Sequence, residues 1–432
     1  MLWQNIGQDV LNCISNTLPM KFWKIKTALF LNYFVFAILL NSVGTVILQV
    51  QNNYGISQGD ASILEAFKDL SIAIVSFLLS SYIVRIGYKN AMLIALGFIA
   101  SICLIMPSTH SFGATKLLFA AVGSSFALIK MSVYSTIGLV TSSEKEHISL
   151  MSFIESFFMV GILTGYFIFS YFADSSDPAS TAWLDVYYVL GALSVVAFLL
   201  LLSTPLDESS IKAEKNESLA SEFAQMFKLL ASPLVLIFIV CAFFYVLIEQ
   251  SIMSWLPTYN NKVLLLPVAL SIQMAGILAG STALGRFLAG ILMKKFNWLY
   301  VLSICLLTAG SLVLLAIPLA GSAGGKAVTG WTDAPVAAFI FPLIGLLLAP
   351  IYPAVNSIIL STLPKKKHGL MSGLIIIFSA LGGTTGSIIT GHIFEQYGGQ
   401  NAFYFSLIPM GILLACLILF NRMQLKTARL LS

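Results

Sequence analysis

The chain has 432 residues, of which 58% are hydrophobic and only 9% are charged. A soluble domain carries about 25% charged residues, so this chain has too few polar groups to cover a soluble surface, and we expect a membrane protein. The net charge of +5 fits the excess of basic residues in the inner loops of a membrane protein better than it fits a nucleic-acid partner.

Apolar blocks recur along the chain, and a helix needs about 20 apolar residues to cross the hydrocarbon core. We therefore predict an all-α polytopic membrane protein with twelve transmembrane helices in two six-helix bundles. The expected parts are a cytoplasmic leader at 1–26, an N-terminal bundle at 27–204, a polar cytoplasmic linker at 205–231, a C-terminal bundle at 232–421 and a cytoplasmic tail at 422–432. The predicted spans are 27–50, 60–83, 90–107, 112–138, 147–171, 184–204, 232–257, 267–292, 299–318, 335–362, 368–394 and 402–421.

Basic residues set the predicted orientation. With the N-terminus inside, the inner segments hold most of the lysines and arginines, and the outer loops hold only Lys262 and Lys326. Because inner loops carry the excess of Lys and Arg, both termini are predicted to be cytoplasmic, in a bacterial-type inner membrane. A plan of six plus six spans is typical of transporters that bind their substrate near the midplane between two halves.

Two stretches of the sequence carry recognisable motifs. The loop 82–89 reads Tyr-Ile-Val-Arg-Ile-Gly-Tyr-Lys. At Arg85, Gly87 and Lys89 it resembles the basic loop motif of the major facilitator superfamily, although Val84 stands at the acidic position. The stretch 243–259, with Glu249 and Trp-Leu-Pro-Thr-Tyr at its end, resembles the fucose–galactose–glucose:proton symporter group. The resemblance implies the major facilitator fold and a carboxylate at Glu249 beside a central cavity. The fucose symporter has proton-carrying carboxylates on its first and fourth spans. This chain has no acidic residue in the predicted first or fourth span, so those roles cannot be transferred.

Charged residues inside spans are costly and are functional hypotheses by default. Glu249 is the first proton-coupling hypothesis, with a helix-tip carboxylate as the alternative. Lys130 and Glu155 are expected at similar depth, as a structural ion pair or as a pair that exchanges a proton or meets an anionic substrate. Glu65, Lys68 and Asp69 share one helical face, either as a self-neutralised cluster at the rim of an outer vestibule or with Asp69 titrating during transport.

Polar and aromatic side chains on the central helices are predicted to contact the substrate. Arg85, Lys89 and Arg286 are predicted to act in gating. Small-residue faces at Gly161 and Gly165, Gly276 and Gly280, and Gly382 and Gly386 allow close helix approach and suit helices that rock against the other half. The predicted substrate-binding residues are Asn32, Asn41, Lys130, Tyr134, Gln250, Trp255, Tyr352 and Asn356.

These features favour a secondary transporter, most simply a monomer that takes up a small polar solute such as a sugar together with protons. The five cysteines lack metal-ligand spacing, and no nucleotide-binding motif of the Walker type is present. We therefore expect no cofactor, no metal and no enzymatic activity. The alternatives are an exporter or organic-anion carrier of the same fold, and a transporter-like receptor that moves nothing.

Overall fold

The computed structural model describes residues 23–79, 82–141, 144–208, 224, 228–293, 295–321, 328–362 and 368–431. The predicted leader therefore lies outside the described residues up to residue 22, as does most of the predicted linker. The first described helix, α2, begins at Trp23, which is four residues before the predicted span.

The first half of the chain forms six helical segments that cross the molecule, two of them broken. Their bounds agree with the predicted spans to within a few residues. Two short 3-10 turns, Met106–Ser108 and Ala182–Asp185, stand beside them. The helices are α2 (Trp23–Asn41) with α3 (Val43–Tyr54), α4 (Gln58–Ala61) with α5 (Ile63–Leu79), α7 (Tyr88–Ile105) after the short α6 (Ile83–Ile86), α8 (Phe112–Val140), α9 (Glu144–Phe172) and α10 (Val186–Leu202).

The second half repeats this plan, with a 3-10 turn at Trp331–Asp333. Its last helix continues to Leu431, through the segment predicted as a tail. The helices are α12 (Pro233–Met253) with α13 (Leu256–Lys262), α14 (Val268–Leu292), α15 (Trp298–Gly321), α16 (Ala337–Leu348) with α17 (Ile351–Thr362), α18 (His368–Tyr397), and α19 (Gly399–Phe405) with α20 (Leu407–Leu431).

Eleven helices of the described chain are long and apolar enough to cross a membrane. The predicted second span is not among them, because α5 has 17 residues and carries Glu65, Lys68 and Asp69. Helices satisfy every backbone polar group internally, which is what a lipid solvent requires.

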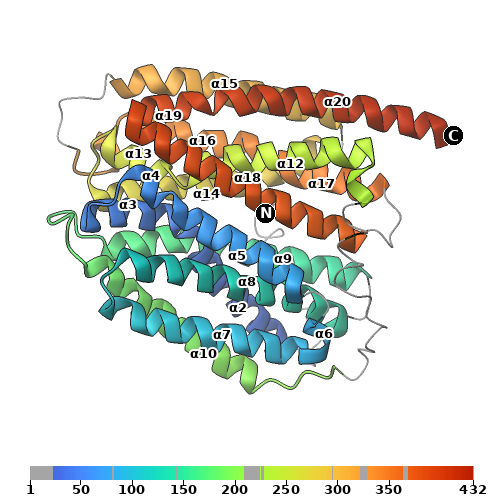
Figure 1. Ribbon diagram of the computed structural model, residues 1–432, viewed down its shortest axis with the longest axis horizontal. Coiled ribbons are helices and arrows are strands. Elements are labelled where there is room, and N and C mark those ends of the chain that lie inside the picture. Colours follow the sequence, from blue (N-terminus) through green and yellow to red (C-terminus); the bar gives the residue numbers. More distant parts are fainter. Residues whose placement is uncertain are drawn as a thin grey trace, which may run out of the picture.

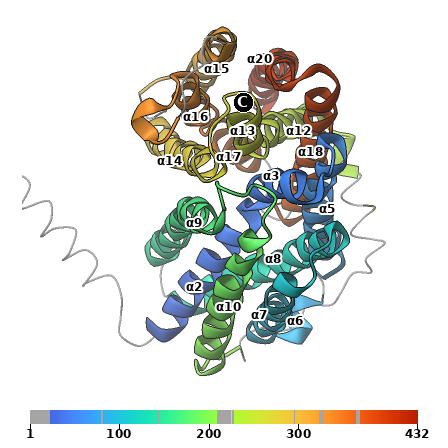
Figure 2. The same cartoon turned by 90° about the vertical axis from the view of Figure 1, so that its left-hand side faces the viewer.

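The helices lie side by side along the long axis, and the two halves of the chain form two separate bundles (Figure 1). Viewed end-on, the bundles meet along two helix pairs, α5 with α18 and α9 with α14 (Figure 2). We call the end of the molecule that holds α3, α4 and α13 the α13 end, and the end that holds α6 and α17 the α17 end. The bundles also touch at the α13 end, where α3 packs on α13 and α4 packs on α18.

Small residues set the distances between helices, but mostly within a bundle. A Cβ added at Gly161 would meet Ala37 of α2 at 2.7 Å, and Gly382 and Gly386 pack against the backbone of α12. Of the predicted small-residue faces, Gly276 is the one that meets the other bundle, at the Tyr166 side chain. The expectation that these faces rock against the other half is therefore wrong for α9 and α18, where they fix neighbours inside one bundle.

Candidate functional site

In the N-terminal bundle, α8 and α9 bring a lysine, a tyrosine and a carboxylate together. The Tyr134 hydroxyl donates to Glu155 Oε1 at 2.6 Å. The Lys130 ammonium lies 5.9 Å from the Phe126 ring centre and 6.0 Å from that of Tyr134. Lys130 is also within electrostatic range of Glu155. Positions 130 and 134 are one helical turn apart, so their side chains share a face of α8.

The expected ion pair between Lys130 and Glu155 is not formed. Among the described residues Lys130 has no carboxylate within the 4.0 Å that defines an ion pair. The Tyr134 hydroxyl occupies the position beside the Glu155 oxygen instead. Glu155 therefore accepts from a neutral donor, and Lys130 has no described carboxylate within ion-pair distance.

The C-terminal bundle holds a matching group. The Tyr245 hydroxyl donates to Glu249 Oε1 at 2.7 Å, from one turn earlier on α12. The Tyr245 ring stacks on Tyr352 of α17, with centroids 5.4 Å apart, and the Tyr352 hydroxyl bonds Ser379 of α18 at 3.0 Å. Arg286 of α14 is within electrostatic range of Glu249.

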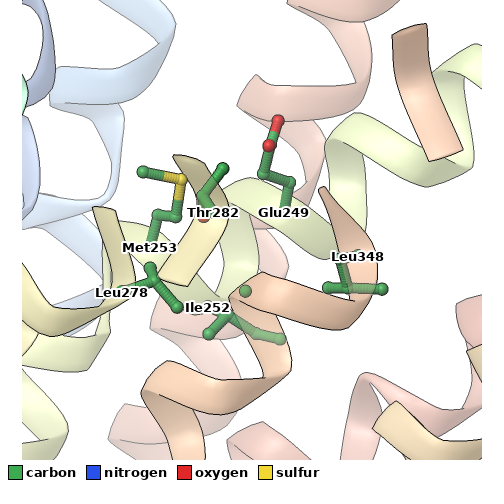
Figure 3. A pocket seen from close by; sticks show the side chains of 7 residues that line it. Glu249, Ile252, Met253, Leu278, Thr282 and Leu348 are labelled. Carbon is green, nitrogen blue, oxygen red and sulfur yellow. The ribbon is translucent and has the colours of Figure 1, made fainter. Parts of the chain in front are cut away.

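Glu249 also borders a small cavity, about large enough for one water molecule. It is lined mainly by apolar side chains of α12, α14 and α16, including Ile252, Leu278 and Leu348. In the close-up the Glu249 carboxylate points away from Ile252 and Leu348 (Figure 3). The carboxyl group therefore lies away from the apolar wall, where it accepts from Tyr245.

The two groups approach each other across the bundle interface. Tyr134 of the N-terminal bundle is within electrostatic range of Tyr352 of the C-terminal bundle. Glu249 is likewise within range of Lys68 on α5. The main members of both groups are partly exposed although they lie within long apolar helices: Lys130, Tyr134, Glu155, Glu249, Arg286, Tyr352 and Asn356.

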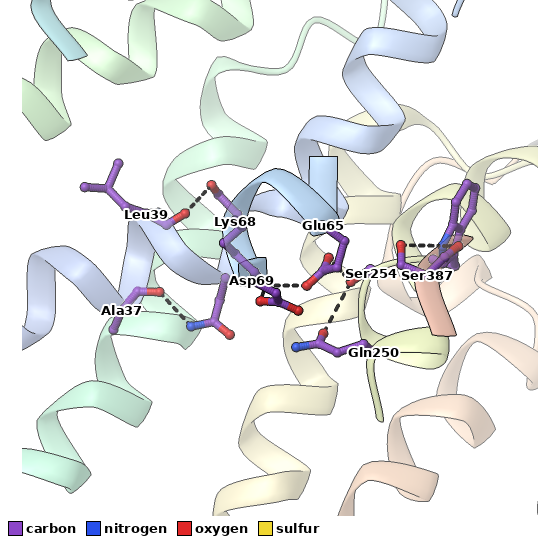
Figure 4. Close-up of polar contacts among 11 residues, drawn as sticks. Ala37, Leu39, Glu65, Lys68, Asp69, Gln250, Ser254 and Ser387 are labelled. Carbon is purple, nitrogen blue, oxygen red and sulfur yellow. Dashed lines mark hydrogen bonds and ion pairs between the residues drawn. The ribbon is translucent and has the colours of Figure 1, made fainter. Parts of the chain in front are cut away.

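A third charged cluster lies nearer the α13 end. The Lys68 ammonium pairs with Glu65, and with Asp69 Oδ1 at 3.4 Å. The Ser254 hydroxyl of the other bundle donates to Glu65 Oε2 at 2.8 Å (Figure 4). All three charged residues are buried, and a Cβ added at Gly383 of α18 would come within 2.5 Å of Asp69 Oδ2. The cluster is self-neutralised in part, as expected, but its expected place at the rim of a vestibule is wrong, because it lies buried between the bundles.

Further polar contacts join the bundles at the α13 end. Gln51 donates to Thr258 at 3.2 Å and Lys262 donates to Asn52 at 2.6 Å. The backbone amide of Gly59 donates to Glu395 at 2.8 Å. In the described part of the chain, the hydrogen bonds that cross from one bundle to the other lie toward this end.

The other predicted substrate-binding residues lie in varied surroundings. Trp255 is fully buried, and its indole N–H donates to Ser387 at the backbone and side-chain oxygens, which is a packing role. Gln250 accepts from Ser254 at 3.3 Å beside the charged cluster. Asn41 donates to the Ala37 carbonyl of its own helix.

Two predicted residues have a buried oxygen without a partner among the described atoms. In Asn32 the amide nitrogen reaches the Met92 sulfur at 3.8 Å, and Oδ1 has no partner. In Asn356 of α17 Oδ1 is likewise unpartnered.

The predicted gating residues separate into two kinds. Lys89 donates from its ammonium to the carbonyls of Leu202 and Thr204 at the end of α10, and from its backbone amide to Glu208. These contacts stay inside the N-terminal bundle or reach the start of the linker. Arg85 is exposed, 5.7 Å from the Tyr82 ring centre. Arg286 differs from both, because it belongs to the Glu249 group.

Sequence reasoning missed Tyr245 and Ser254. Tyr245 stands four residues before Glu249, so helical spacing alone places it on the same face. Ser254 gave no local signal, since its partner Glu65 is 189 positions away. Within the described residues, no three His, Cys, Asp or Glu side chains gather as a metal site would require.

Comparison with known families settles the class. The family model described as Major Facilitator Superfamily matches residues 29–341 and 311–429. The chain belongs to the major facilitator superfamily. The fold predicted from the sequence is thereby confirmed, as is a transporter rather than an enzyme.

Relatives of this superfamily member are distant. A protein named TsgA homolog from Buchnera aphidicola subsp. Baizongia pistaciae (strain Bp) is 23% identical over 399 residues, covering 90% of this chain and 94% of that protein. A bacterial homolog of the human lysosomal transporter Spinster, solved inward-facing and occupied, superposes with a TM-score of 0.73 at 15% identity, over 92% of this chain and 96% of that one. The fucose:proton symporter of E. coli, solved as a single-residue variant, gives 0.60 at 14% identity, over 93% and 99%.

Proposed function

We propose that this major facilitator protein is a proton-coupled secondary transporter that takes up a small polar solute by alternating access. The two bundles would open in turn to either side of the membrane around the Glu155 and Glu249 groups. The α13 end, where the bundles are bonded together, would face outward, with both termini in the cytoplasm of a bacterial-type cell. The proposal treats the chain as a monomer.

The observation that carries the proposal is the pairing of each carboxylate with a tyrosine. A tyrosine hydroxyl both donates and accepts hydrogen bonds. The contacts of Glu155 with Tyr134 and of Glu249 with Tyr245 therefore persist whether the carboxyl group is ionised or protonated. A charge inside the membrane is costly, so such a carboxyl group gains from exchanging a proton as its access to water changes. One such pair in each bundle supports coupling between proton movement and bundle movement.

A sugar is one solute class to test. The similar E. coli protein is named a fucose:proton symporter, and the partly exposed rings of Tyr134 and Tyr352 offer stacking faces beside hydroxyl groups. The second solute class is an organic anion, because Lys130 lacks an acidic partner among the described residues.

The test is solute uptake into proteoliposomes that are reconstituted with the purified full chain. Labelled fucose, xylose, succinate and glucose 6-phosphate are supplied with and without an inward proton gradient. We expect the proton gradient to stimulate the uptake of at least one of these solutes. Stimulation should fall to the level without gradient in Glu249→Gln or Glu155→Gln, because an amide cannot carry a proton.

A matched control is Asp333→Asn, which neutralises an exposed loop carboxylate of the C-terminal half and should leave stimulation unchanged. If stimulated uptake survives in both glutamine variants and in the double variant, the coupling role of these carboxylates is wrong. If no solute moves under any gradient, the transporter-like receptor becomes the better interpretation.

A further inference from the structure

Lys130 and Arg286 differ from the lysines that form ion pairs within the described spans. Lys26 forms an ion pair with Glu146 at 2.8 Å, and Lys68 is paired with two carboxylates. Lys130 lies beside the rings of Phe126 and Tyr134, and no described carboxylate is within 4.0 Å of its ammonium group. Arg286 forms no ion pair with a described residue, and its Nε is buried without a partner.

The acids nearest to Lys130 and Arg286 do not form ion pairs with them in the described structure. Glu155 and Glu249 each take a tyrosine hydroxyl at 2.6 and 2.7 Å, while the cation of the same group stays beyond 4.0 Å in the described structure. An unpaired charge within a membrane span is expensive, and such residues usually pair or mark a substrate path. Lys26 and Lys68, in the same set of helices, do form such pairs.

The two cations lie on opposite sides of the interface between the bundles. Lys130 belongs to α8 of the first bundle and Arg286 to α14 of the second. Each sits beside a tyrosine–glutamate pair, and the tyrosines Tyr134 and Tyr352 bring the two groups within electrostatic range. A ligand between the bundles would therefore meet one positive charge from each side, together with tyrosine hydroxyl donors.

We propose that the transported solute is a small organic anion and that Lys130 and Arg286 are the charges that receive its carboxylate or phosphate group. A neutral sugar would need hydrogen bonds and stacking faces but no cation held out of a close ion pair. The guanidinium of Arg286 suits a planar or branched oxyanion, and the ammonium of Lys130 acts as a point charge. This inference rests on the proposed function and names the substrate class of the same site.

The test is ligand-dependent thermal unfolding of the purified full chain in detergent, at constant ionic strength. The probes are succinate, citrate and glucose 6-phosphate, with fucose and glucose as neutral counterparts. We expect a saturable rise of the midpoint with at least one anion and none with the sugars. The affinity for that anion should fall about tenfold or more in Lys130→Gln and in Arg286→Gln, because each variant loses a hydrogen bond to a charged group.

Two further variants separate a specific role from a general one. Lys130→Arg keeps the charge and should retain most of the affinity. Lys116→Gln removes a lysine that lies 4.4 Å from the Phe112 ring centre, in the first turns of α8, and should leave anion binding unchanged. If Lys130→Gln fails to fold, Arg286→Gln in the other bundle still decides the matter.

The proposal is overturned if the sugars stabilise the chain and the anions do not, if no anion stabilises it, or if anion binding is the same in Lys130→Gln and Arg286→Gln as in the native chain. Failure of the proposed function is a different result. Gradient-driven uptake of a sugar would support the proton-coupled transporter and contradict an anionic substrate. Anion binding that depends on Lys130 and Arg286, without any uptake, would support the anionic ligand and contradict proton-coupled transport.

Discussion

The sharpest stability prediction concerns Lys68, the lysine of the buried cluster on α5. Lys68→Met keeps the length and volume of the side chain and removes the one positive charge between Glu65 and Asp69. The side chains of Glu65 and Lys68 are 0% and 4% exposed, and that of Asp69 is 11% exposed. Water therefore offers little compensation to the two acids that remain.

Removing one partner of a buried ion pair costs about 3–5 kcal/mol, because the other charge stays buried and uncompensated. The Ser254 hydroxyl already bonds Glu65 in the native chain, so it supplies no new stabilisation to the variant. We expect the free energy of unfolding to fall by about this amount. The midpoint of thermal unfolding should drop by roughly 3–13 °C, less if the whole chain unfolds as a unit and more if one bundle does.

The assay is intrinsic-fluorescence unfolding of the detergent-purified chain, compared at one scan rate because membrane proteins often unfold irreversibly. Two variants serve as controls. Lys116→Met removes a lysine that forms no ion pair with a described residue and should shift the midpoint by less than about 2 °C. A triple variant with Glu65→Gln, Lys68→Met and Asp69→Asn should recover most of the loss, since no buried charge remains. An unchanged midpoint in Lys68→Met alone would refute the idea that the ammonium compensates these carboxylates.

Three more variants test single contacts. The valine side chain of Gly383→Val has no room beside Asp69 Oδ2, so this variant should weaken the contact between the bundles at the α13 end. A cysteine placed at the buried Thr258 should then react several-fold faster with a membrane-impermeant thiol reagent. An unchanged labelling rate would mean that the α13 end accommodates the valine. Lys89→Met frees the carbonyls at the end of α10 and should lower stability by about 1–3 kcal/mol while uptake by the folded fraction is kept; lost uptake at native stability would restore a gating role. Trp255→Ala should cost about 3–5 kcal/mol and leave the solute binding constant unchanged in the folded fraction, whereas weaker binding at native stability would indicate direct contact.

The helices were predictable because their signal is local. A span needs about 20 apolar residues, and the blocks are separated by short polar segments, so bounds such as those of α14 and α18 agree closely with the predicted 267–292 and 368–394. The breaks inside spans were less visible. The first span is interrupted at Ser42, between α2 and α3. The Ser42 hydroxyl donates to the Leu39 carbonyl, a contact with no clear sequence signature.

The site was predictable in its residues and not in its pairings. Glu155, Glu249 and Lys130 stood out because a charge within an apolar helix is rare. Which donor satisfies each charge depends on rotamers and neighbouring helices, so the Tyr134 hydroxyl in place of the Lys130 ammonium could not be foreseen. Trp255 matched a sequence motif, but motif identity does not reveal that its indole faces Ser387 inside the bundle.

The difference between tyrosine and lysine as partners also ranks the predicted proton carriers. Protonating Asp69 would remove the charge attraction of its ion pair with Lys68, whereas the partner of Glu249 is the neutral Tyr245 hydroxyl, which can donate or accept. We therefore expect gradient-stimulated uptake to persist in the charge-balanced variant that combines Asp69→Asn with Lys68→Met, which leaves the overall charge unchanged. Uptake is measured with the solute that responds best in the native chain, and Glu249→Gln is the positive control for uncoupling. Stimulation lost in the double variant at normal folding would assign the coupling role to Asp69 and remove the argument from tyrosine partners.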